Sequence, residues 1–172
     1  IPVLASIKDA ADIVMDVHLM IEEPIRYVEA FHKAGADILN VHYEACEDVQ
    51  ATLDAIHKCG MKAGLTIKPA TPVDVLKPYL EQAELFLIMS VEPGKGGQSF
   101  IPESLDKIRE LRGLLNEKGL TADVEVDGGI HLGNAKEVLE AGANVLVAGS
   151  AVFKDNIAEN VKGFMEILNE NE

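Results

Sequence analysis

Acidic and histidine side chains alternate with apolar ones in residues 15–20. Asp16, His18 and Met20 would share one face of a β-strand there. A polar group at the end of a barrel strand points toward the mouth of an active site, where histidine and carboxylates bind metals or move protons. The alternative is a structural Asp with a His satisfied in the core. This segment alone leaves both interpretations open.

A second acidic strand end is followed by two glycines. Glu125 and Asp127 would share a strand face, and Gly128 and Gly129 come directly after Asp127. Glycines let the backbone approach a ligand closely and donate its N–H groups. Asp before Gly-Gly is also a common turn sequence. A ligand-binding strand end and an ordinary turn therefore both remain open.

Two further segments are candidates for an anion site. Residues 94–97 contain three glycines, more than a tight turn needs, which predicts an anion cradle or a mobile lid. A merely flexible loop is the alternative. Gly149 and Ser150 follow the last apolar run, and in β/α barrels the loops after the final strands commonly bind phosphate with the N-terminus of a short helix.

Asn40, His42 and Glu44 also alternate toward the end of a predicted strand. Without a further motif, we interpret them as structural residues or as support behind the site. The remaining histidines occur in helical or loop surroundings and are interpreted as surface residues.

The elements that must position these residues alternate regularly between strand and helix patterns, which predicts one domain over residues 1–172. The predicted strands are 13–19, 37–42, 62–67, 85–91, 124–127 and 144–148. The predicted helices are 24–33, 47–58, 71–79, 102–117, 132–140 and 157–169, and residues 3–10 are read as the end of an earlier helix.

Strand and helix alternation of this kind predicts an α/β fold with a parallel sheet. Glycine follows a helical pattern directly before a strand at Gly35, Gly60 and Gly142, which is typical of regular barrel units. No G-x-G-x-x-G follows the first strand, so the dinucleotide-binding doubly wound sheet lacks its fingerprint. A barrel is favoured, although 172 residues fall short of the ~250 of a complete eight-stranded one.

Composition restricts the class of partner. A net charge of −14 repels nucleic acids and anionic lipids, so we expect neither as a partner. Cys46 and Cys59 have no metal-type spacing and fit reduced thiols in a cytoplasmic protein. No apolar run reaches ~18 residues. Because the chain begins with Ile1, we expect that something precedes it.

Taken together, the motifs resemble the ribulose-phosphate 3-epimerase family in order and spacing. The segments that carry the resemblance are 16–21, 69–72, 89–91, 94–100, 125–129 and 148–151. The resemblance implies a TIM (β/α)8-type barrel without its first two strands. It also implies an isomerase of the pentose phosphate pathway that epimerises D-ribulose 5-phosphate at C3 to D-xylulose 5-phosphate.

The resemblance further implies roles for individual residues. His18 and Asp127 would bind one divalent metal ion (Zn, Fe, Mn or Co), and Asp127 would be one of two acid/base carboxylates. The family supplies a Ser, a His and the partner Asp from its first two strands, the latter two within a His-x-Asp-x-Met-Asp-Gly segment, and neither these strands nor this segment occurs upstream of Asp16. Lys95 replaces a usual aromatic residue. Substrate and phosphate contacts are expected from His18, Met20, Met89, Gly94, Lys95, Gly96, Gly97, Gly128, Gly129, Gly149 and Ser150.

Two alternatives to this function remain. A related epimerase of hexulose 6-phosphates would share the phosphate and acid/base parts. The chain as given would otherwise be an inactive fragment or scaffold, whose unpaired strand edge invites a partner. For the epimerase we expect a sugar-phosphate substrate and a homo-oligomer.

Overall fold

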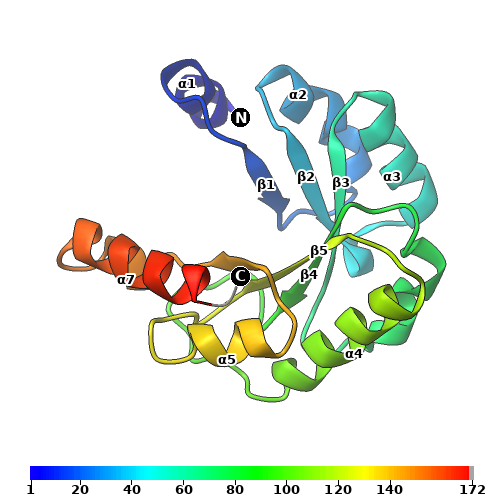
Figure 1. Cartoon of the computed structure of the whole chain (residues 1–172). Helices are drawn as coiled ribbons and strands as arrows, with labels where there is room; N and C mark the ends of the chain where they lie inside the picture. The colour runs from blue at the N-terminus through cyan, green and yellow to red at the C-terminus, as the bar shows by residue number, and fades with distance from the viewer. Residues whose placement is uncertain (171–172) are drawn as a thin grey trace.

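A computed structural model describes residues 1–170 and contains a six-stranded sheet that curls on itself, with helices on its outer side (Figure 1). Each strand pairs in parallel with the next one along the chain, so the order is sequential. A doubly wound sheet would reverse its order at a switch point, which this sheet does not. The strands are β1 (Asp16–Leu19), β2 (Ile38–His42), β3 (Lys62–Ile67), β4 (Leu85–Met89), β5 (Asp123–Asp127) and β6 (Val145–Val147).

The predicted α/β class and all six strands are confirmed, with ends that differ by a few residues. The largest difference is at β1, which begins at Asp16 rather than at residue 13. Ile13 and Val14 are exposed, since β1 has a neighbouring strand on only one side among the described residues.

Helices follow the strands where the sequence predicts them. Two predictions differ in type. Within 71–79, Val73–Tyr79 forms a 3-10 helix, η3, because Pro78 lacks the N–H that an α-helix interior requires. Within 24–33, Pro24–Tyr27 forms a 3-10 helix, η1, before the α-helix begins at Val28. The α-helices are α1 (Pro2–Ala10), α2 (Val28–Lys33), α3 (Val49–Lys58), α4 (Ser104–Glu117), α5 (Ala135–Glu140), α6 (Ser150–Phe153) and α7 (Ile157–Asn169). The 3-10 helices are η1 (Pro24–Tyr27), η2 (Tyr43–Ala45) and η3 (Val73–Tyr79).

The two faces of the sheet have different compositions. Outward-facing residues such as Leu39, Leu65 and Phe86 are fully buried in the main core beneath the helices, which also contains Ile56 and Ile108. Because side chains alternate along a strand, the neighbouring positions face the inside of the curled sheet. The inside holds a small apolar cluster around β4 and the polar residues of the site.

The described sheet is open, because β1 and β6 are its two edges and do not pair with each other. Helices α1 and α7 flank this opening (Figure 1). Both carry exposed apolar side chains, among them Val3, Ile7, Val161 and Met165. Within residues 1–170, no helix is both long and apolar enough to cross a membrane.

Candidate active site

The deepest polar residues inside the sheet form a hydrogen-bonded chain from β3 through β2 to β5. Thr66 Oγ1 donates to Asn40 Oδ1 over 2.6 Å, and Asn40 Nδ2 donates to Glu125 Oε2 over 3.0 Å. A Cβ atom at Gly64 would lie 2.7 Å from Asn40 Cγ, so glycine leaves the room that Asn40 needs. The chain holds the Glu125 carboxyl group in a buried position.

Glu125 is a carboxyl group that holds its proton unusually strongly. Burial, followed by the nearby carboxylates of Asp16 and Asp127, raises the pKa of Glu125 to about 8. Burial also raises the pKa of Asp16, but Asp16 lies on the edge strand β1 and is the more exposed of the two, so we place the proton shared by Asp16 and Glu125 on Glu125. Glu125, at the bottom of the site, is therefore uncharged. This limits its electrostatic repulsion of the Asp127 carboxylate.

One level higher, the ends of β1, β2 and β5 bring two histidines and a carboxylate together. His18 Nε2 lies 2.8 Å from His42 Nε2, and the two rings stack with their centroids 4.9 Å apart. His18 Nδ1 lies 3.5 Å from Asp127 Oδ2. Three strands separate β1 from β5 in the sheet, so His18 and Asp127 meet because the sheet curls.

The His18–Asp127 pair has the spacing of two ligands of one metal ion. Ligand atoms about 2.1 Å from an ion, at a tetrahedral angle, lie about 3.4 Å apart. The observed distance between His18 Nδ1 and Asp127 Oδ2 is 3.5 Å. Within residues 1–170 no group of three or more His, Cys, Asp or Glu residues is arranged to hold a metal. The pair therefore fits part of a metal site and does not complete one.

A cavity of about 380 Å³ opens beside Asp127 at the carboxyl ends of β4, β5 and β6. Its walls include every residue that the sequence predicts for substrate or phosphate binding except His18, which contacts Asp127 instead. These residues are Met20, Met89, Gly94, Lys95, Gly96, Gly97, Gly128, Gly129, Gly149 and Ser150, and the predicted catalytic residue Asp127 lines the same cavity. The structure brings the predicted residues together, and their roles stay predictions.

Two glycines after β5 let two loops of this cavity lie against each other. Gly129 has φ +64°, and a Cβ atom there would lie 2.4 Å from the backbone nitrogen of Phe100. Gly128 has φ +124°, and a Cβ atom there would overlap the side chain of Val91. The side chain of Gln98 also ties the loop after β4 by donating to the carbonyls of Glu92 and Lys95. This loop is held by its own contacts rather than being merely flexible.

Ser90 is a buried residue whose role sequence reasoning missed. Its backbone N–H donates to Asp127 O over 2.8 Å, and its hydroxyl lies 2.7 Å from Gly128 O. These bonds join the end of β4 to the turn that follows β5. Ser90 thereby fixes the position of the Asp127 backbone. A serine at a strand end has no local pattern that would have revealed this contact.

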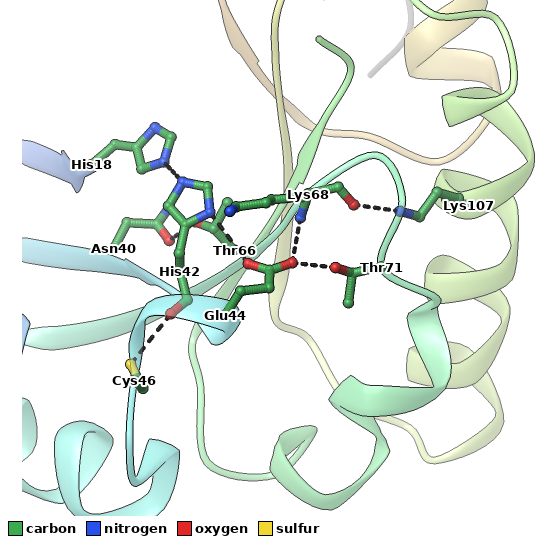
Figure 2. A network of polar contacts seen from close by, with 9 residues as sticks. All are labelled: His18, Asn40, His42, Glu44, Cys46, Thr66, Lys68, Thr71 and Lys107. Atoms are coloured by element: carbon green, nitrogen blue, oxygen red, sulfur yellow. Dashed lines mark hydrogen bonds and ion pairs between the residues drawn. The ribbon is translucent and has the colours of Figure 1, made fainter. Parts of the chain in front are cut away.

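The end of β2 carries a second carboxylate, Glu44, with a more complete set of donors (Figure 2). Glu44 Oε1 accepts from the backbone N–H of Lys68 over 2.8 Å and from the Thr71 hydroxyl. Burial alone would raise the pKa of Glu44, but the nearby His42 ring and the hydrogen bonds from Thr71 and Lys68 outweigh it and lower the pKa to about 2. Sequence reasoning treated His42 and Glu44 as support, and the alternation of polar residues in an apolar strand was the available signal.

Curated proteins resemble this chain closely over part of their length. A ribulose-phosphate 3-epimerase of Synechocystis is 55% identical over 152 residues, which are 87% of this chain and 66% of that protein. One of Bacillus subtilis is 49% identical over 88% of this chain and 70% of its own length. A chloroplastic ribulose-5-phosphate-3-epimerase of Arabidopsis thaliana is 47% identical over 94% of this chain and 58% of its own length. The chain thus spans about two thirds of the relatives it matches.

Solved structures support the barrel fold. A 3-hexulose-6-phosphate synthase from Salmonella typhimurium superposes with a TM-score of 0.73 at 19% identity, covering 99% of this chain and 81% of that one. The model of the ribulose-phosphate 3 epimerase family matches residues 1–153, which include every strand and the cavity described above. From this match and the identities of its relatives, the chain belongs to the ribulose-phosphate 3-epimerase family.

Proposed function

We propose that the protein containing this chain converts D-ribulose 5-phosphate into D-xylulose 5-phosphate by inverting the configuration at C3. The observation that carries the proposal is the cavity of about 380 Å³ that unites Asp127 with the glycine segments of three strand ends. Small-molecule sites have volumes of roughly 300–1,000 Å³, so a pentose phosphate is of suitable size. Relatives named as ribulose-phosphate 3-epimerases support the choice of reaction.

In the proposed reaction, the Asp127 carboxylate exchanges a proton with C3 of the substrate. Asp127 lines the cavity and is held at the end of β5 by the bonds that Ser90 makes to its carbonyl. Loss of the C3 proton beside the ketone forms an enediolate, and return of a proton to the opposite face gives inversion. A second acid/base group must therefore lie across the substrate from Asp127.

A divalent metal is part of the proposal, with His18 and Asp127 as two of its ligands. When bound, the metal would supply positive charge where the substrate oxygens become negative. The 3.5 Å spacing of His18 Nδ1 and Asp127 Oδ2 supports this assignment. The ring of His42 stacks on that of His18 and holds it in place.

The phosphate group is proposed to bind at the glycine-rich side of the cavity. Gly149 and Ser150 stand at the start of α6, where the first N–H groups of a helix lack partners within the helix. The chain has a net charge of −14, so attraction must come from such local donors and from Lys95, which also lines the cavity.

The test is a conversion assay with the full-length protein in deuterated water. We expect xylulose 5-phosphate carrying deuterium at C3, loss of conversion after removal of divalent metal by a chelator, and recovery on adding the metal back. A higher kcat/KM for a hexulose 6-phosphate would show that the proposed substrate is wrong. Full activity in the chelated, metal-free protein would remove the metal from the proposal while leaving the reaction.

A further inference from the structure

Two histidine rings stand in series between two carboxylates at the mouth of the site. Glu44 Oε2 lies 3.5 Å from His42 Nδ1, His42 Nε2 lies 2.8 Å from His18 Nε2, and His18 Nδ1 lies 3.5 Å from Asp127 Oδ2. Figure 2 shows the part of this series from His18 to Glu44. Every ring nitrogen in the series therefore faces either the other ring or a carboxylate.

The short contact between the rings couples their tautomers. A neutral imidazole has one N–H donor and one acceptor nitrogen, so one Nε2 must donate to the other. If His18 Nε2 donates, the proton of His42 is on Nδ1, toward Glu44, and His18 Nδ1 presents a lone pair to Asp127. If His42 Nε2 donates, the proton of His18 is on Nδ1 instead. The two arrangements differ at the atom that faces Asp127.

The surroundings of His42 favour the first arrangement. The His42 side chain is 4% exposed, and its Nδ1 is buried without a hydrogen-bond partner at normal distance. A lone pair at this nitrogen would face the Glu44 carboxylate with little solvent between them, whereas an N–H would be attracted to it. The two carboxylates are similarly exposed, Glu44 at 20% and Asp127 at 24%, but the His18 ring is 16% exposed against 4% for His42. Water therefore screens the interaction of His18 Nδ1 with Asp127 more than that of His42 Nδ1 with Glu44.

Glu44 is held so that it can act in this way. Its Oε1 is occupied by the donors Lys68 N and Thr71 Oγ1, which leaves Oε2 directed to His42. The segment that supplies these donors is itself tied down, because Lys107 Nζ donates to Lys68 O over 2.8 Å (Figure 2). Lys107 Nζ also donates to Pro69 O over 3.0 Å. The carboxylate therefore keeps its orientation relative to the ring.

The geometry points to Glu44 as a positioning residue that keeps the proton of His42 on Nδ1, so that His18 presents an unprotonated Nδ1 toward Asp127. This inference rests on the proposed metal site, because a lone pair and a carboxylate oxygen at that spacing attract a divalent cation. An N–H at the same place would have to be moved before the cation could bind, which weakens binding. Glu44 acts through His42 and His18 and is not among the residues that line the cavity beside Asp127.

Substituting Glu44→Gln should reverse the direction in which the two histidines donate their protons. Lys68 N is an obligate donor, so the amide oxygen of the new side chain must take the place of Oε1. The amide nitrogen then stands where Oε2 faced His42 Nδ1 and donates to it. His42 would carry its proton on Nε2 and donate to His18, and His18 would be protonated on Nδ1.

The tautomers can be read directly from long-range proton–nitrogen correlation spectra of the metal-free protein at about pH 8, where an ordinary histidine is neutral. We expect protonated Nδ1 at His42 and protonated Nε2 at His18 in the wild type, and both reversed in Glu44→Gln. Thr71→Ala is the matched control, since it removes one contact to the same carboxylate but leaves Oε2 in place. It should keep the wild-type tautomers.

Two results would overturn the inference: a wild-type His42 protonated on Nε2, or a folded Glu44→Gln variant with unchanged tautomers. The backbone amide spectrum shows whether Glu44→Gln is folded. If it is unfolded, the tautomers of wild-type His42 and His18 alone decide whether the inference holds. A merely structural role for Glu44 would change stability without moving the proton.

Titration with Zn²⁺ alone separates this inference from the proposed function. Zinc should perturb the His18 Nδ1 signal in the wild type and bind about 10–100-fold more weakly to Glu44→Gln, the usual effect of losing such support. Equal affinities would contradict the role of Glu44. If the wild type bound no zinc at His18, the proposed metal site would be wrong, while the metal-free spectra would still decide the tautomers.

Discussion

The ends of β2 and β5 both carry a carboxylate that faces the inside of the sheet, but their surroundings differ. Glu44 has a backbone N–H and a hydroxyl on one oxygen and a histidine beside the other. Asp127 has His18 at 3.5 Å and otherwise borders the cavity, next to two glycines. The comparison teaches that neighbouring donors decide which carboxylate is held as a fixed anion and which stays open to the cavity, where the proposed function requires a carboxylate that exchanges a proton.

Glu125 extends the comparison in depth. It lies two positions before Asp127 on the same strand, but it is buried and has a pKa raised to about 8. Burial favours the neutral form of a carboxyl group, whereas the donors around Glu44 favour its anion. Burial and neighbouring donors thus give the three carboxyl groups of this interior three different environments.

The largest expected effect on stability comes from adding a side chain at Gly129, where the loop after β5 lies against the loop after β4. Gly129→Ala forces a side chain into a left-handed backbone conformation and against Phe100 N, so we expect a loss of about 3 kcal/mol in the free energy of unfolding. Gly96→Ala is the control, because nothing lies within 4 Å of a Cβ atom there. Chemical denaturation of both variants measures the difference, and equal losses would show that the close approach of the two loops is unimportant.

A smaller effect, on binding rather than folding, is expected at Gly149. Its φ is −87° and a Cβ atom there would meet nothing within 4 Å, so Gly149→Val is compatible with the fold. The added side chain would project near the start of α6 and weaken binding of ribulose 5-phosphate by about tenfold, or about 1.4 kcal/mol. Calorimetric binding and thermal unfolding should be compared. Comparable losses in both would indicate a purely structural glycine.

The smallest expected effect is a pH-dependent one at Glu44. Its pKa is lowered from 4.5 to about 2, so its contribution to stability is present above pH 4.5 and is lost as the pH falls toward 2. Glu44→Gln should therefore be less stable than the wild type by about 1 kcal/mol at about pH 7, with the gap narrowing below pH 4.5 and closing near about pH 2. Urea unfolding at the two pH values checks this. A gap that stays constant would mean that the charge of Glu44 contributes nothing.

Much of the fold was predictable because strand and helix periods, with glycines between them, are local signals. The six strands and the position of Asp127 before two glycines follow from such patterns. The pairing of His18 with Asp127 was predicted only as a consequence of the family resemblance. Their meeting requires the sheet to curl, which no local pattern reports.

The supporting residues were less predictable for a physical reason. Lys68 and Thr71 bind Glu44 through contacts between segments 24 to 27 positions apart in the chain. Asn40 reaches Glu125 across 85 positions because Gly64 leaves space between them. Such contacts depend on how strands stand beside one another, so residue type and spacing alone could mark Asn40, His42 and Glu44 only as support.

Deuterium exchange at C3 of ribulose 5-phosphate tests most directly whether Asp127, and not Glu44, moves the proton. In the full-length, metal-loaded protein we expect Asp127→Asn to slow exchange by about 10²–10⁴-fold, the usual contribution of general acid/base catalysis. Glu44→Gln should slow it by no more than about 100-fold, with activity partly restored by excess metal. Wild-type exchange in Asp127→Asn, or a loss in Glu44→Gln as large as that in Asp127→Asn and unaffected by metal, would contradict the account.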